Sequence, residues 1–186
     1  MRTALGFRAH SGWAAMVVVA GSLDSPRVLE RRRIEIADPE MPGSKQPFHA
    51  AADLPFPQAE ALVRSAADSS RALALEAMSA TLKRLRALGH EIAGCGLLLG
   101  SGKALPELEK ILASHALIHT AEGELFRDVL MWAAKEYRLP VTGVREKDLD
   151  ASALKRIGSL GKLIGPPWTQ DQKYAAMAAL MTLGSA

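Results

Sequence analysis

The sequence predicts an α/β fold with a mixed sheet, in which a three-stranded antiparallel meander is followed by two parallel strands and flanked by helices. Three observations predict it: short β-favouring segments open the chain, a continuous apolar run lies near its middle, and helical patterns separate that run from the last short β segment. The chain has 186 residues, of which 48% are apolar, enough for one buried core but not for two. We therefore expect a single domain over residues 1–186.

The first three strands are expected at residues 4–8, 13–20 and 27–36, because short turn-forming segments separate them. The third mixes charged and apolar side chains on both faces and contains Arg31, Arg32 and Arg33. Such a pattern is typical of an edge strand protected against further pairing. We interpret these arginines as edge protection rather than as a nucleic-acid patch.

Residues 38–56 carry several prolines and no clear period, so we expect a surface loop there. From residue 57, apolar side chains recur at helical spacing until Gly89, which predicts one long helix. The apolar, glycine-rich run at residues 92–99 predicts a central strand covered on both faces, with a parallel neighbour. Its Cys95 is the one cysteine of the chain, so we expect a buried, inert thiol and a cytoplasmic protein.

The rest of the chain alternates helices with one strand. We expect a short helix at residues 105–113 with Pro106 in its first turn, and a second at 121–137 with Thr120 as N-cap. A strand at 141–144 and a helix at 152–164 follow. Thr169 and Gln172 then form a capping box that opens the last helix. The apolar side of that helix carries Tyr174, Met177, Ala178 and Met181.

Charge and hydropathy restrict the partners only weakly. The net charge of +3 and the pI of about 9.2 allow a polyanionic partner without requiring one. The apolar run at residues 13–20 is much shorter than the roughly 20 residues of a membrane span. We therefore expect a strand there and no association with a membrane.

This order of elements, together with local features of three segments, resembles the ribonuclease H-like superfamily and in particular its Holliday-junction resolvases. Residues 6–14 look like the first strand and turn of those resolvases, residues 121–141 like their helix and following strand, and residues 168–175 like the acidic start of their last helix. The resemblance covers most of the chain as an order of elements. It implies a nuclease scaffold, in which carboxylates hold two divalent cations that activate water.

The metal-binding carboxylates of that family are largely missing here. Arg8 stands where the resemblance expects an essential aspartate, the acid expected after the fourth strand falls near Gly100 and Ser101, and Tyr174 replaces a second aspartate after Asp171. An arginine cannot ligate a metal, and its positive charge opposes cation binding nearby. We predict that Asp171, the one acid that matches, contacts Arg8 instead.

Residues 115–127 are the densest group of candidate site residues, because they hold His115, His119, Glu122 and Arg127. On one helix, the two histidines would share a face as metal ligands, with Glu122 one turn further on. If Thr120 caps a new helix, the histidines lie in a turn and that geometry fails. A helix N-terminus with His119 and Arg8 would then form an anion site, and we favour this interpretation. In a purely structural interpretation, a histidine bonds to loop backbone and Glu122 complements the helix dipole.

Two further motifs are incomplete. Gly100 to Lys103 lies in the setting of a phosphate-binding loop, but the glycine spacing and the hydroxyl of that motif are missing, so we expect a tight turn. Ser11, His10 and Asp24 offer the groups of a catalytic triad, but no nucleophile elbow surrounds the serine.

We therefore expect a catalytically degenerate ribonuclease H-like protein that binds a phosphate-containing ligand or nucleic acid. The expected anion-binding residues are Arg8, His10, His119, Glu122, Arg127 and Asp171. One alternative is a single-metal phosphodiesterase or nuclease, and its divalent cation, the one cofactor considered, would bind His115, His119, Glu122 or Asp171. Another is a homo-oligomeric scaffold, for example a homodimer, that uses Phe48 and Phe56 as exposed apolar contacts.

Overall fold

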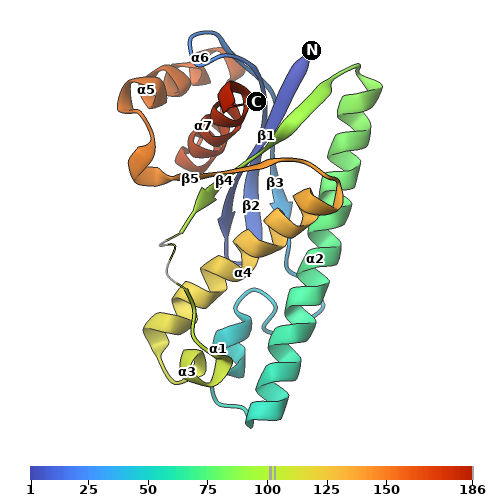
Figure 1. Cartoon of the computed structure of the whole chain (residues 1–186), viewed down its shortest axis with the longest axis vertical. Coiled ribbons are helices and arrows are strands. Elements are labelled where there is room, and N and C mark those ends of the chain that lie inside the picture. The colour runs from blue at the N-terminus through green and yellow to red at the C-terminus, as the bar shows by residue number, and fades with distance from the viewer. Residues whose placement is uncertain (101, 103, 186) are drawn as a thin grey trace.

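One mixed five-stranded sheet forms the centre of the protein in the computed structural model, which describes residues 1–100, 102 and 104–185 (Figure 1). The strands are β1 (Arg2–His10), β2 (Trp13–Gly21), β3 (Pro26–Glu35), β4 (Glu91–Leu99) and β5 (Val141–Arg145), in the order β3-β2-β1-β4-β5. The first three pair in antiparallel fashion, and β4 is parallel to both β1 and β5. The predicted sheet is confirmed, and so is the edge position of β3.

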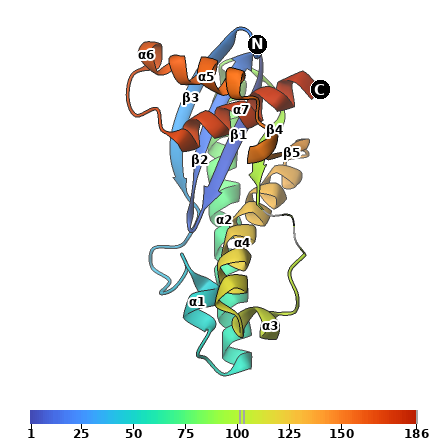
Figure 2. The ribbon, with the colours of Figure 1, turned by 90° about the vertical axis from the view of Figure 1, so that its left-hand side faces the viewer.

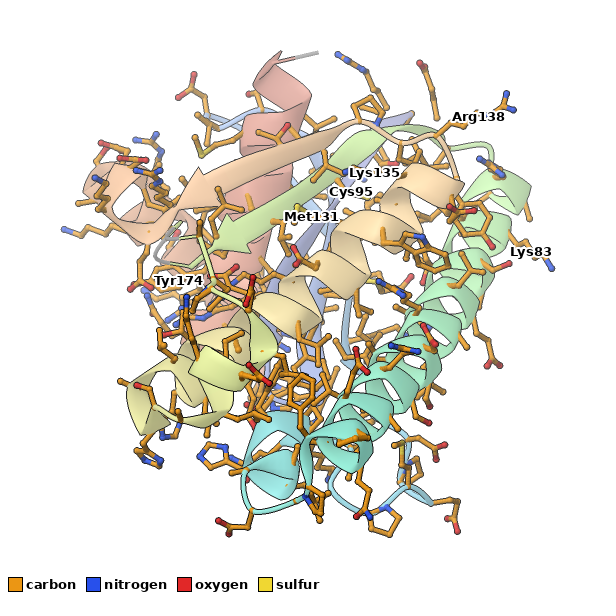
Figure 3. The ribbon with its side chains drawn as sticks, turned by 60° about the horizontal axis from the view of Figure 1, so that its bottom comes forward. Lys83, Cys95, Met131, Lys135, Arg138 and Tyr174 are labelled. Carbon is orange, nitrogen blue, oxygen red and sulfur yellow. The ribbon has the colours of Figure 1, made fainter. Side chains whose placement is uncertain are left out.

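Helices cover both faces of this sheet (Figure 2). On one face lie α2 (Phe56–Ala87) and α4 (His115–Glu136), and on the other α5 (Ala151–Ser159) and α7 (Gln170–Ser185). Successive side chains of a strand point to opposite faces of the sheet. In β1, Leu5 and Phe7 therefore lie in the cluster with α2 and α4, whereas Ala4 lies in the cluster with α5 and α7. Figure 3 shows Cys95 and Met131 in the layer between β4 and α4, and Cys95 is buried as predicted.

Helix α7 lies directly on the sheet because two strand residues lack side chains. A Cβ atom at Gly6 of β1 would lie 1.8 Å from the carbonyl oxygen of Ala175. At Gly96 of β4 it would lie 2.1 Å from the carbonyl oxygen of Ala178. Both distances are far below van der Waals contact, so only glycine allows this approach.

The arginines of the edge strand bind within the chain. Arg31 donates hydrogen bonds to the carbonyl oxygens of Gly165 and Ile164, at 2.7 and 2.8 Å. Ile164 is the last residue of α6 (Gly161–Ile164), and Gly165 follows it. These hydrogen bonds therefore connect β3 to the end of α6. This geometry supports edge protection, the role that we inferred from the sequence.

Several helix boundaries differ from the predictions. The predicted loop contains α1 (Pro47–Ala51), and α3 (Leu108–Leu112) begins after Pro106 rather than around it. The helix expected at residues 152–164 is divided into α5 and α6 at Leu160. A 3-10 turn, η1 (Glu146–Asp148), follows β5. The capping box of α7 is present, because Gln172 N donates to Thr169 Oγ1 at 3.3 Å and Thr169 N donates to Gln172 Oε1 at 3.0 Å.

The N-cap predicted at Thr120 is wrong. Helix α4 begins at His115, with Ser114 in the N-cap position, and runs through Thr120 without a break. The Thr120 hydroxyl donates to the carbonyl oxygen of Ala116 at 3.0 Å, one turn earlier. A threonine inside a helix can satisfy its hydroxyl in this way, so it need not mark a helix start.

The two short helices α1 and α3 pack with the first turns of α2 and α4 beyond one end of the sheet (Figures 1 and 2). This extension has its own apolar cluster, which contains Phe48, Ile111, Ile118 and Ala121. No helix in the described part of the chain is long and apolar enough to cross a membrane.

Candidate functional sites

Arg8 and Asp171 form an ion pair at one end of the sheet. Arg8 Nε lies 3.1 Å from Asp171 Oδ1, and both side chains are partly buried. Glu146, from η1, adds a carboxylate 3.6 Å from Arg8 Nη2. The guanidinium also lies over the Tyr174 ring, 4.5 Å from its centroid, and Figure 3 shows Tyr174 at the end of the molecule away from Arg138. The predicted contact between Arg8 and Asp171 is confirmed, whereas Glu146 was not predicted.

The topology explains why these groups meet. Strands β1, β4 and β5 run parallel, so their carboxyl ends share one edge, where Arg8 lies two residues before the end of β1 and Glu146 follows β5. The capping box starts α7 above this edge and places Asp171 in its first turn. Groups far apart in sequence are thereby brought to the position that active sites occupy in α/β sheets.

His10 extends the same site. Its Nε2 lies 3.0 Å from Asp171 Oδ1, although the two groups are not aligned as a hydrogen bond. Its ring stacks on Trp13, with centroids 4.3 Å apart and 10° between the planes. The Nη1 atom of Arg8 is buried and lacks a hydrogen-bond partner among the described residues. A buried donor without a partner costs free energy.

Arg127 of α4 reaches this site as well. With Arg8, His10 and Glu146 it lines a cavity of about 170 Å³. Arg127 Nη1 lies 3.1 Å from Glu124 Oε1, and a Cβ atom at Gly100 would lie 2.3 Å from that same oxygen. A Glu–Arg pair from α4 therefore occupies the space beside the end of β4, where the family resemblance expects an acid. Ser101 and Lys103, from the incomplete phosphate-loop motif, lie outside the described residues.

Three histidines form a second cluster in the helical extension. His49 of α1 joins His115 and His119 of α4, and one ring nitrogen of each lies within 4.8 Å of the others. The Nε2 atoms of His115 and His119 are 3.0 Å apart. The side chain of Glu122 is 2% exposed, and its Oε1 lies 2.9 Å from His49 Nδ1. His49 was not predicted as a member of this site, because no periodic pattern connects its proline-rich segment with α4.

The structure thus divides the predicted anion site into two. Arg8, His10, Arg127 and Asp171 gather at the sheet edge, whereas His119 and Glu122 lie with His49 and His115. Along α4, Arg127 follows the two histidines by 8 and 12 residues, which at 1.5 Å per residue is about 12 to 18 Å. The group of three possible metal ligands contains His115 and His119 but neither Glu122 nor Asp171.

Two other predicted constellations do not assemble. His10 pairs with Trp13, the first residue of β2. Asp24 follows the last residue of β2, Gly21, and so lies at the opposite end of the sheet. Ser11, His10 and Asp24 therefore cannot form a triad.

Phe48, one of the two side chains proposed as an exposed apolar contact, is only 7% exposed because it packs in the extension, whereas Phe56 is 41% exposed.

Comparison with solved structures defines the fold class as ribonuclease H-like. The chain is similar to RuvC of T. thermophilus in complex with a Holliday junction substrate, with a TM-score of 0.58, 14% identity, and coverage of 100% of this chain and 96% of that one. It is similar to a second Thermus thermophilus RuvC structure, with a TM-score of 0.55, 14% identity, and coverage of 98% and 95%. No protein-family model and no curated protein matches the sequence.

Proposed function

We propose that this chain is a non-cleaving protein of ribonuclease H-like fold that binds the phosphate backbone of nucleic acid at the edge formed by β1, β4 and β5. The ion pair between Arg8 and Asp171 carries the proposal. A two-metal nuclease needs free carboxylates for its cations. Here the carboxylates of Asp171 and Glu146 already face the fixed positive charge of Arg8, which would repel a divalent cation.

The same edge suits a phosphate group. Arg8 and Arg127 line the same small cavity. Arginine forms charge-assisted hydrogen bonds to phosphate oxygens. The cavity of about 170 Å³ is smaller than the roughly 300 to 1,000 Å³ of pockets that enclose whole ligands, so it fits one group on a longer chain better than a free nucleotide. One of the similar solved structures is described as a complex with a Holliday junction substrate, which supports a nucleic-acid partner.

Binding and cleavage can be tested with one set of DNA probes. Fluorescence anisotropy with labelled four-way junction, duplex and single-stranded DNA should show binding that weakens as salt rises. Arg8→Ala should weaken it for all sequences and reduce the salt slope by about 1. The matched control is Arg64→Ala, which removes an exposed arginine that pairs with Glu60 on α2.

Cleavage assays with magnesium on branched and duplex DNA should give no product. Magnesium-dependent turnover that disappears in Asp171→Asn would overturn the non-cleaving proposal. An intracellular location in the cytoplasm belongs to the same proposal and rests on the free thiol of Cys95.

A further inference from the structure

We propose that His49, His115 and His119 form a binding site for a zinc-class divalent transition cation, with Glu122 as the residue that orients His49. The proposal is independent of the one above, because it uses neither Arg8 nor nucleic acid. Imidazole nitrogen is a preferred ligand of zinc, and three histidines with one open position form an established kind of zinc site.

The spacing of the ring nitrogens fits such an ion. With zinc–nitrogen bonds of about 2.0 to 2.1 Å and tetrahedral angles, ligand nitrogens lie roughly 3.3 Å apart. The His115 and His119 Nε2 atoms are 3.0 Å apart, and the possible ligand atoms of all three histidines lie within 4.8 Å. His115 and His119 share one face of α4 because they are four residues apart on a continuous helix. Small rotations of three side chains would close the site around one ion.

Glu122 fixes the third ligand in the required state. Its carboxylate can only accept hydrogen bonds, so His49 Nδ1, 2.9 Å away, carries the proton. The Nε2 atom of His49 then has a free lone pair for a metal. Metal-binding histidines usually donate their other ring N–H to a carboxylate or carbonyl in this way, which fixes the ring and raises its basicity.

The charge of Glu122 points to a cation as well. The carboxylate is 2% exposed, and no lysine or arginine of the described residues lies within 4.0 Å of it. It accepts hydrogen bonds from the backbone N–H and the ring of His49, at 3.2 and 2.9 Å. A buried carboxylate needs compensating charge. A divalent ion on the far side of the His49 ring would supply it.

The fourth coordination position would face solvent. His115 and His119 are exposed and His49 is partly exposed, so water or a small anion can reach an ion held by the three rings. The site also joins α1 to α4, because His49 comes from the proline-rich segment and the other two ligands from α4. A bound ion would therefore fasten that segment to the helix.

Tag-free protein, first stripped of metal, should be titrated with Zn²⁺ by calorimetry and with Co²⁺ by visible absorption. We expect one ion per chain, and cobalt bands of the intensity that four-coordinate sites give, which change when free imidazole is added. His119→Ala and His115→Ala should abolish this binding. Both side chains are exposed, so these variants should fold. Glu122→Gln should weaken binding by about 10- to 100-fold.

The matched control is His90→Ala, which removes a histidine between α2 and β4, outside the cluster. It should bind zinc as the unaltered chain does. Absence of stoichiometric binding would overturn the proposal. So would binding that survives His119→Ala, or that falls equally in His90→Ala.

Discussion

The guanidinium of Arg8 and the carboxylate of Asp171 lie 3.1 Å apart, joining the end of β1 to the first turn of α7. Glu146 approaches the same guanidinium at 3.6 Å. One arginine thus contacts two acids from different elements, at the edge formed by the carboxyl ends of β1, β4 and β5. The positive charge of Arg8 is part of the chain and cannot be displaced by magnesium. The charge balance at this edge of the sheet should therefore not depend on a bound metal.

Replacing Arg8 by an acid should make the stability of the chain depend on a divalent cation. Arg8→Asp would place a third carboxylate beside Asp171 and Glu146 and should destabilise the chain by about 1 to 2 kcal/mol without divalent ions. Millimolar magnesium should raise the melting temperature of the variant, because a cation would again neutralise the three acids. Thermal unfolding with and without magnesium measures the effect.

The unaltered chain is the control for that experiment. It keeps the positive charge of Arg8 beside Asp171 and Glu146, so magnesium should leave its melting temperature unchanged. A magnesium-dependent rise in the unaltered chain would mean that Asp171 and Glu146 already bind a metal, contrary to the role assigned to Arg8.

Adding one methyl group beneath α7 should disturb both stability and the Arg8 site. Gly6→Ala would place a Cβ atom 1.8 Å from the carbonyl oxygen of Ala175, so the helix must move away. We expect a loss of about 1 to 3 kcal/mol in urea unfolding, together with weaker DNA binding, since Asp171 lies in the first turn of that helix. Gly158→Ala is the matched control. No atom of the residues that the structure describes lies within 4 Å of its Cβ position in α5, so it should be neutral or slightly stabilising.

Cys95 should be unreactive in the folded chain. Burial raises the pKa of this thiol from 9.0 to about 12, so it stays protonated at neutral pH. A thiol reagent should label it only after denaturation, and rapid labelling of the folded chain would show that the sheet opens. Between pH 9.0 and about 12 the unfolded chain loses this proton while the folded chain keeps it, so stability should fall as the pH rises through that interval.

Local patterns predicted the strands and the start of α7, because alternation, turn residues and a capping box act over a few neighbouring positions. The contact of Arg8 with Asp171 was predictable only through the family resemblance, which supplied the arrangement of β1 and α7. Thr120 misled the prediction, since its hydroxyl can cap a helix or bond one turn back within it, and sequence alone does not distinguish these. His49 was missed because tertiary packing alone, with Phe48 buried in the extension, brings it to α4.

The continuity of α4 through Thr120 sets a fixed spacing between the two sites. Arg127 and the histidines lie on one straight element, separated by about 12 to 18 Å. A ligand that contacted both sites at once would therefore have to span about 12 to 18 Å along α4.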